Sequence, residues 1–181
     1  MNLVTGATGL VGSHVLLTLL QQDKPVIAMK RSTSDVKEVE RVFSYYTADY
    51  KELYNKIVWR EGDLSDALGF DELLKDVSTV YHCAALISLN DKDRAKLMKA
   101  NVEGTANLVN ACLRSKIESF CFVSSIATLQ NKDITSDIDE TIFWKTIPQQ
   151  SVYSLSKYLA EQEVWRGIEE GLNAAIVNPA V

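Results

Sequence analysis

Tyr153 and Lys157 stand four residues apart in the stretch YSLSK, and this spacing is the first sign of chemistry in the sequence. On a helix, residues i and i+4 lie on one face, so both side chains could point at the same partner. A free tyrosine has a pKa of about 10 and is a poor acid–base catalyst at neutral pH, but a nearby ammonium favours the phenolate. The pair is therefore either an acid with the cation that tunes it or an ordinary helix surface.

A glycine-rich turn supplies context for this pair. The stretch VTGATGLVGSHV lies between a short apolar run and a helical pattern. Glycines let the backbone approach phosphates closely, and a helix N-terminus offers free N–H groups and a positive dipole end. A glycine-rich turn without a ligand is the alternative, but the strand before it and the helix after it favour nucleotide binding. The candidate phosphate-binding residues are Gly6, Thr8, Gly9, Leu10, Val11 and Gly12.

The end of the second apolar run is where a dinucleotide-binding fold reads the adenine ribose. An acidic residue there favours NAD, whereas a basic residue accommodates the 2′-phosphate of NADP. The sequence is AMKRSTSD, which places Lys30 and Arg31 there and leaves Asp35 too far along the chain. An arginine fork suits a phosphate monoester. We therefore expect NADP in preference to NAD, although solvated basic residues at a strand end remain the alternative.

Short apolar runs alternate with helical patterns along the whole chain. Such strands, buried on both faces, are typical of a parallel sheet, and right-handed crossovers then give a doubly wound sheet. We predict an α/β fold of about six strands with helices on both faces, the NAD(P)-binding Rossmann fold. The expected strands are 2–5, 25–29, 56–59, 79–84, 119–125 and 174–179, and the expected helices lie near 10–22, 34–54, 70–76, 92–115 and 151–171. The polar stretch 127–150, which contains Pro148, is expected to form a loop over a site.

Composition narrows the partners and the compartment. A net charge of −5 and a pI of about 5.1 argue against nucleic-acid binding. No apolar run approaches the roughly 18 residues of a membrane span, and no basic leader precedes the apolar N-terminal stretch. The three cysteines include no CxxC pair, so neither a disulfide framework nor a metal site is predicted, and we expect Cys83 and Cys121 to be buried thiols. The cytoplasm is the expected compartment.

Seven stretches occur in the order found in a known family. They are TGATGLVG, GDLSD, HCAA, NVEGT, FVSSIA, YSLSK and VNPA. In these motifs the chain resembles the extended short-chain dehydrogenases/reductases, and within them the NAD(P)-dependent epimerase/dehydratase family and its dihydroflavonol-reductase-like branch. The resemblance covers essentially all 181 residues. The combination of TGxxGxxG with YxxxK is much more specific than either motif alone.

The resemblance implies a role for each matched position. Ser125, Tyr153 and Lys157 would form the catalytic site; Ser125 is preferred to its neighbour Ser124 because it precedes IATL in the register of the family. Asp63 would contact adenine, although it could instead cap a helix. His82 is expected to be a strand-end histidine with satisfied hydrogen bonds, and Asn101 is expected to shape its helix or order a water. The other implied cofactor-binding residues are Leu64, Ala84, Ala85, Asn178 and Pro179, together with Tyr153, Lys157 and Asn101.

The reaction implied by the resemblance is hydride transfer between a nicotinamide and a secondary alcohol or ketone carbon. A nucleotide-sugar epimerase or dehydratase with retained NAD shares the Ser–Tyr–Lys site and is the alternative. A non-catalytic NADP-binding module is a third possibility, which the tyrosine–lysine pair argues against. The resemblance also implies a homodimer through helices 92–115 and 151–171. It further implies that residues 1–181 are a dinucleotide-binding domain, with a small substrate-binding domain missing or truncated after Val181.

Overall fold

Six parallel strands form one sheet in the order β3-β2-β1-β4-β5-β6. The computed structural model describes residues 1–129, 139–141, 144 and 150–180. The strand order reverses beside β1, so a crevice opens at the carboxyl ends of β1 and β4, where such sheets bind ligands. The predicted doubly wound α/β fold is confirmed. The strands are β1 (Asn2–Thr5), β2 (Val26–Lys30), β3 (Val58–Glu61), β4 (Thr79–His82), β5 (Ser119–Val123) and β6 (Ala174–Val177).

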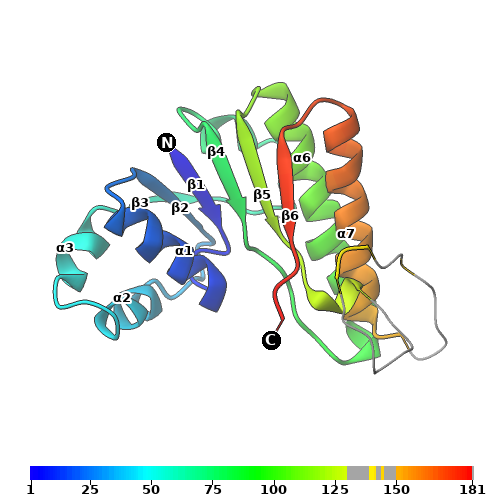
Figure 1. The fold of residues 1–181 in the computed structure, drawn as a ribbon, viewed down its shortest axis with the longest axis horizontal. Helices are drawn as coiled ribbons and strands as arrows, with labels where there is room; N and C mark the ends of the chain where they lie inside the picture. The colour runs from blue at the N-terminus through cyan, green and yellow to red at the C-terminus, as the bar shows by residue number, and fades with distance from the viewer. Residues whose placement is uncertain (130–138, 142–143, 145–149, 181) are drawn as a thin grey trace.

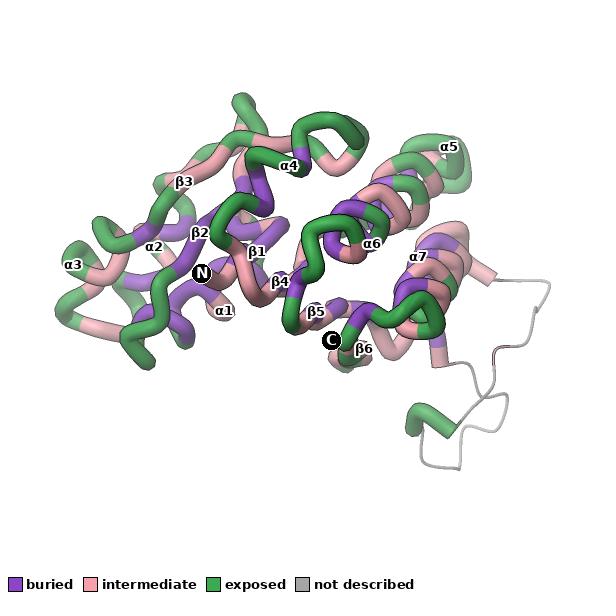
Figure 2. The backbone as a smooth tube through the Cα atoms, turned by 90° about the horizontal axis from the view of Figure 1, so that it is seen from above, coloured by how far each residue is buried: buried purple, intermediate pink, exposed green. Residues whose placement is uncertain are grey.

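The helices form a layer on each side of the sheet (Figures 1 and 2). On one side lie α1 (Leu10–Gln21), α2 (Lys37–Ser44) and α3 (Tyr50–Asn55), and on the other lie α4 (Phe70–Leu73), α5 (Arg94–Leu97), α6 (Gly104–Arg114) and α7 (Val152–Glu169). No helix in the described ranges combines the length and the hydrophobicity that a membrane crossing requires. Helices α6 and α7 pack side by side. The homodimer expected through these helices stays a prediction.

The central strands are apolar at successive positions because both faces of the sheet are covered. In β1, Leu3 packs into the cluster that α6 and α7 cover, while Val4 packs into the cluster that α1 covers. In β2, Ile27 and Ala28 divide between the two clusters in the same way. Successive side chains of a strand point to opposite faces, so a strand covered on both faces is apolar at every position.

Two predicted helices are interrupted. The segment 34–54 is not one helix but α2 and α3, and Asp49, which precedes α3, donates its backbone N–H to the hydroxyl of Thr47. Short polar side chains that bond the local backbone in this way compete with helix formation. The segment 92–115 divides into the 3₁₀ turn η1 (Asp91–Asp93), α5, the π-helical turn η2 (Met98–Glu103) and α6.

The region predicted as a loop begins with a 3₁₀ turn, η3 (Ile126–Thr128), directly after β5. Residues 130–138, 142–143 and 145–149 lie outside the described part of the chain, and with them Pro148 and most of the predicted loop. Trp144 is described and stacks on Tyr158 of α7 with ring centroids 4.1 Å apart. Trp144 therefore lies against α7.

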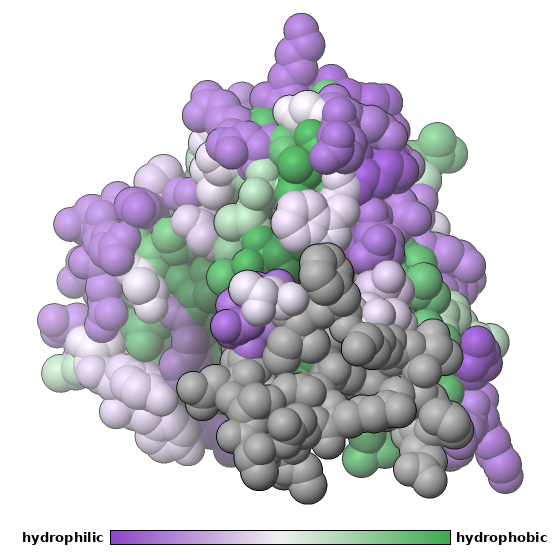
Figure 3. Space-filling model, turned by 45° about the vertical axis from the view of Figure 1, so that its right-hand side comes forward, coloured by the Kyte–Doolittle hydropathy of each residue, from purple (hydrophilic) through white to green (hydrophobic). Residues whose placement is uncertain are grey.

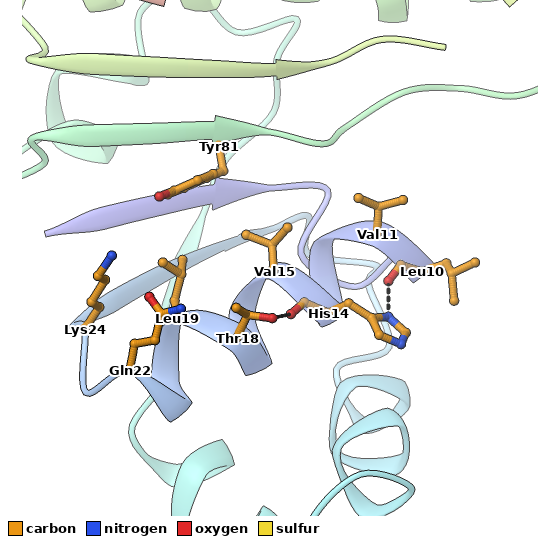
Figure 4. Close-up of a pocket in the computed structure, with 9 residues that line it drawn as sticks. All are labelled: Leu10, Val11, His14, Val15, Thr18, Leu19, Gln22, Lys24 and Tyr81. Atoms are coloured by element: carbon orange, nitrogen blue, oxygen red, sulfur yellow. Dashed lines mark hydrogen bonds between the residues drawn. The ribbon is translucent and has the colours of Figure 1, made fainter. Parts of the chain in front are cut away.

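One face of the sheet is open at β5 and β6 on the side of α1. Cys83 and Cys121 lie on this side and are half-buried, so the expectation of buried thiols is wrong, and Val177 is 44% exposed. The reason is that no helix of the described residues covers this end of the sheet (Figure 2). Apolar side chains are correspondingly visible at the surface between two hydrophilic regions (Figure 3). An apolar hollow of about 610 Å³ runs along α1 beneath Tyr81 (Figure 4).

Candidate active site

The turn between β1 and α1 leaves no room for a side chain at Gly6 or at Gly12. Gly6 has φ of +63°, and a Cβ on it would lie 2.7 Å from the Cα and N atoms of Ala84. A Cβ on Gly12 would overlap the carbonyl oxygen of Gly6. Gly9 precedes α1, and no side chain caps this helix. The turn therefore leaves backbone N–H groups at a helix N-terminus, and this cradle fits a pyrophosphate.

A cleft of about 460 Å³ lies at the carboxyl edge of the sheet. Its residues come from the cradle, the end of β2, the turn after β3 and the turn after β4. The predicted residues in its lining are Gly6, Thr8, Gly9, Lys30, Arg31, Asp63, Leu64, Ala84 and Ala85. The sequence thus located four separate segments that the fold brings to one cleft. Leu10 and Val11 instead line the hollow along α1 (Figure 4), so only their backbone N–H groups could serve a phosphate.

Asp63 closes a turn and caps no helix of the described residues, and its contact with adenine stays a prediction. Its Oδ1 accepts hydrogen bonds from the backbone N and the Oγ of Ser65, each at 2.8 Å, which closes a turn. These two bonds lower the pKa of Asp63, and the charges of Arg31 and Lys99 lower it further. Since both bonds use Oδ1, Oδ2 can accept from a donor in the cleft, such as the amino group of adenine.

Lys96 and Lys99 are cleft residues that the sequence analysis missed. Both line the cleft. Lys96 is paired with Asp93 at 2.9 Å, whereas Lys99 lies close enough to Asp63 to stabilise its carboxylate. Their spacing of three residues places them on one helical face. Two lysines at this spacing, just before NVEGT, were the sequence feature that could have identified them.

The two adjacent serines after β5 have different surroundings. The Oγ of Ser125 accepts a hydrogen bond from the backbone N of Ala127 at 3.1 Å and caps η3. Its own hydroxyl hydrogen therefore remains available for a substrate oxygen. The Oγ of Ser124 is buried and has no hydrogen-bond partner among the described residues. The geometry is compatible with the choice of Ser125, which stays a prediction.

Lys157 is buried at the edge of the sheet. It is 1% exposed, its Nζ donates to the carbonyl oxygen of Val123 at 2.9 Å, and it lies 4.2 Å from the ring centroid of Phe122. Burial lowers its pKa to about 8, against the opposing effects of Glu161 and Cys83. The contact with Val123 holds α7 to the strand that ends just before Ser125. Tyr153 is half-buried one turn earlier on the same helix.

A buried hydrogen-bond chain connects the strand ends to α7. Thr105 donates to the backbone oxygen of Asn101 at 2.5 Å, so its Oγ1 must accept from the Nε2–H of His82 at 3.0 Å. The other ring nitrogen of His82 then accepts from Thr5 at 2.7 Å. His82 is fully buried with both nitrogens satisfied, as expected. Burial, and secondarily the charge of Lys157, lower its pKa to about 3.

Asn101 lies inside the π-helical turn and is 2% exposed. Its side chain accepts from the backbone N of Leu86 at 2.7 Å and donates to the backbone oxygen of Leu86 at 3.0 Å and to Ser156 at 2.9 Å. The structure therefore gives Asn101 a role in shaping the protein. Since these contacts occupy its amide group, its predicted cofactor contact stays a prediction.

Asn178 and Pro179 lie beside η3. The Nδ2 of Asn178 is 3.2 Å from the carbonyl oxygen of Ser125, and the carbonyl oxygen of Pro179 accepts from the backbone N of Ile126 at 3.2 Å. Neither residue lines the cleft that holds the cradle. Their cofactor contacts stay predictions, and the structure places both residues where they hold the Ser125 turn.

The model of the NAD dependent epimerase/dehydratase family matches residues 2–181. A protein of Synechocystis sp. named as a dihydroflavonol 4-reductase is 31% identical, with 98% of this chain and 48% of that protein covered. Sterol demethylase protein B of Methylococcus capsulatus is 30% identical, with 98% and 50% covered. The chain thus spans about half the length of these curated relatives.

Solved structures share the same fold. The crystal structure of gox2253 is 39% identical, with a TM-score of 0.82, and the match covers 99% of this chain and 51% of that one. UDP-glucose 4-epimerase of Thermus thermophilus, solved with NAD, is 23% identical, with a TM-score of 0.79 and coverage of 98% and 54%. At that identity the second likeness concerns the fold alone.

Proposed function

The chain belongs to the NAD-dependent epimerase/dehydratase family, and from this premise we propose that it is the dinucleotide-binding part of an NADP-dependent reductase. The reaction is hydride transfer between the nicotinamide and the carbon of a secondary alcohol or ketone in a small molecule. The nicotinamide supplies or accepts the hydride when bound. The residues of the chain bind the dinucleotide, orient the substrate oxygen and move the proton.

The observation that carries the proposal is the cleft in which the cradle meets Lys30 and Arg31. Asp35, the first acid after β2, is engaged locally, because its Oδ1 accepts from the backbone N of Lys37 at 2.9 Å. A ribose with free 2′ and 3′ hydroxyls would find no carboxylate at the end of β2. A 2′-phosphate would find the guanidinium of Arg31, whose planar fork can donate two parallel hydrogen bonds to it.

The proton chemistry falls to residues at the end of β5 and on α7. Ser125 would donate to the substrate oxygen, and Tyr153 would give a proton to that oxygen in reduction or take it in oxidation. Lys157 has three N–H donors and uses one on Val123. The others can bind a ribose hydroxyl, and the positive charge favours the tyrosinate that remains after proton transfer.

The experiment that tests this function is calorimetric titration of the chain with NADPH and with NADH. We expect tighter binding of NADPH. Loss of charge-assisted hydrogen bonds worth about 1.5–3 kcal/mol in Arg31→Ala would weaken NADPH binding about 10- to 150-fold and leave NADH binding nearly unchanged. Arg114→Ala is the matched control, because Arg114 is exposed at the end of α6, away from the cleft.

The same titration can instead favour an epimerase or dehydratase. Preference for NADH, or NAD that stays bound through purification, would contradict the NADP site and favour an epimerase or dehydratase with retained NAD. Turnover then separates the two chemistries. NADPH oxidation with a dihydroflavonol would support the reductase, whereas conversion of UDP-glucose without net NADPH oxidation would overturn it.

A further inference from the structure

Glu161 is a buried acid that the proposed chemistry does not use. It lies on α7 one turn beyond Lys157 and is 8% exposed. No lysine, arginine or histidine forms a salt bridge with it in the described part of the chain. Its Oε1 instead accepts from Thr128 Oγ1 and from Asn178 Nδ2, each at 2.8 Å. Because a buried carboxylate is costly unless it is well bonded, these two neutral donors need an explanation.

Both donors belong to segments that hold the Ser125 turn. Thr128 ends η3, and its Oγ1 lies 2.9 Å from the carbonyl oxygen of Ser125. Asn178 follows β6, and its Nδ2 lies 3.2 Å from the same oxygen. A hydroxyl has one hydrogen, so an ionised Glu161 takes the hydrogen of Thr128, while the amide of Asn178 serves both Glu161 and Ser125. The carboxylate thereby joins η3, α7 and the end of β6.

The same carboxylate acts on the charge of Lys157. Burial lowers the pKa of Lys157, and Glu161 is the first of the groups that oppose this shift. The other titratable groups near Lys157 are His82 at the end of β4, Cys83 directly after it, and Tyr153 on its own helix. Cys83 stays protonated because burial raises its pKa to about 12, and His82 is neutral above pH 3. Glu161 is therefore the acidic side chain whose charge acts on Lys157.

We propose that Glu161 is a positioning residue, which fixes the Ser125 turn against the helix of Tyr153 and Lys157 and helps keep Lys157 charged. The inference rests on the proposed function for its catalytic meaning. Its structural part concerns contacts within the chain and can be tested without turnover.

The test compares Glu161→Gln with Glu163→Gln. Glutamine at 161 keeps a carbonyl oxygen for Thr128 and Asn178 but loses the charge. Glu163 lies on the same helix, pairs with Arg166 at 3.0 Å and does not touch the site. Titration of the lysine side chains by ¹⁵N NMR, with Lys157→Arg to assign the signal, reports the midpoint of Lys157 directly. We expect a lower midpoint in Glu161→Gln and an unchanged one in Glu163→Gln.

Turnover with NADPH and a dihydroflavonol supplies the second readout. We expect kcat of Glu161→Gln to fall about fivefold at pH 8, because lowering a pKa of about 8 by about one unit reduces the charged fraction of Lys157 from about a half to about a tenth, with a smaller loss at pH 6, where Lys157 is again protonated. KM should change little. An unmoved Lys157 midpoint, or a loss of kcat that is the same at both pH values, would overturn the proposal. If NADPH does not bind while the midpoint shifts, the proposed function fails and the effect of Glu161 on the charge of Lys157 stands.

Discussion

The phosphate cradle and the Ser125–α7 site are built in opposite ways. The cradle comes from seven consecutive residues, Gly6 to Gly12. It would bind phosphate through backbone N–H donors, in space that glycines leave free of side chains. The site around Ser125 is assembled from β5, η3, α7 and the end of β6, and its working groups are side chains. Substitutions in the cradle should therefore act on binding, and substitutions in the site should act on rate.

The largest expected effect belongs to Tyr153, which would move the proton. Tyr153→Phe removes the phenolic hydroxyl alone, so we expect kcat to fall by about 10²- to 10⁴-fold, the usual contribution of a positioned acid–base group. NADPH affinity by calorimetry should be nearly unchanged. Tyr158→Phe is the control, because Tyr158 uses its ring to stack on Trp144. Full activity in Tyr153→Phe would show that Tyr153 does not move the proton.

The next effect separates two neighbouring hydroxyls. Ser125→Ala should lower kcat about 10²- to 10³-fold, the typical cost of one aligned donor to a developing oxyanion. Ser124→Ala removes a buried hydroxyl without a partner in the described chain, so we expect stability to be unchanged or slightly raised and kcat to stay the same. The reverse pattern, with the rate lost in Ser124→Ala, would assign the catalytic role to Ser124.

This contrast also explains what the sequence could predict. The cradle, the basic end of β2 and the six strands were predictable because each is a local pattern of neighbouring residues. The break between α2 and α3 was missed, because the bond between Thr47 and Asp49 competes with the helix only in a particular backbone geometry. The half-buried state of Cys121 depends on which helices cover the sheet, and an apolar strand does not reveal this.

The part of the site that escaped prediction consists of contacts between distant segments. Glu161 and Thr128 are 33 residues apart, and Asn101 and Ser156 are 55 apart. Nothing in the neighbourhood of either residue specifies its partner. The family motifs marked Asn101 and Asn178 as important, but only the fold shows that their amides bond within the protein.

Gly12→Ala tests the cradle sterically. A Cβ at this position meets the backbone of Gly6, which cannot yield as a flexible side chain could. We expect destabilisation of about 1–3 kcal/mol, typical of overpacking, and a loss of NADPH affinity that exceeds any change in kcat at saturation. In the control Gly62→Ala, the added Cβ would come no closer than 3.5 Å to Met29 and Leu73, and the melting temperature should hardly change. Equal effects of the two substitutions would show that the cradle has no special geometry.

The smallest expected effect belongs to His82, which connects the two regions. Its ring hydrogen-bonds Thr5, the residue before the cradle, and Thr105 on α6, the helix that packs against α7. Its pKa is about 3 in the folded chain instead of 6.5. Between pH 3 and pH 6.5 the imidazole of His82 is protonated in the unfolded chain and neutral in the folded chain. The free energy of unfolding is therefore highest above pH 6.5 and decreases as the pH falls below that value. The slope from this proton is about 1.4 kcal/mol per pH unit, or about 2 kcal/mol between pH 6.5 and 5.

Urea denaturation at pH 7, 6 and 5 measures this slope. His82→Gln should lose the contribution, and His14→Gln should keep it, because His14 lies outside the buried chain and bonds Tyr46. ¹⁵N NMR of the unaltered protein gives a check that does not depend on how well the variant folds. The Nε2 of His82 must donate to Thr105, so the spectrum should show one neutral tautomer, with the proton on Nε2, from pH 7 to pH 5. A ring that becomes doubly protonated in this range would contradict the hydrogen bonds of His82 to Thr5 and Thr105, and with them the connection between the cradle and α7.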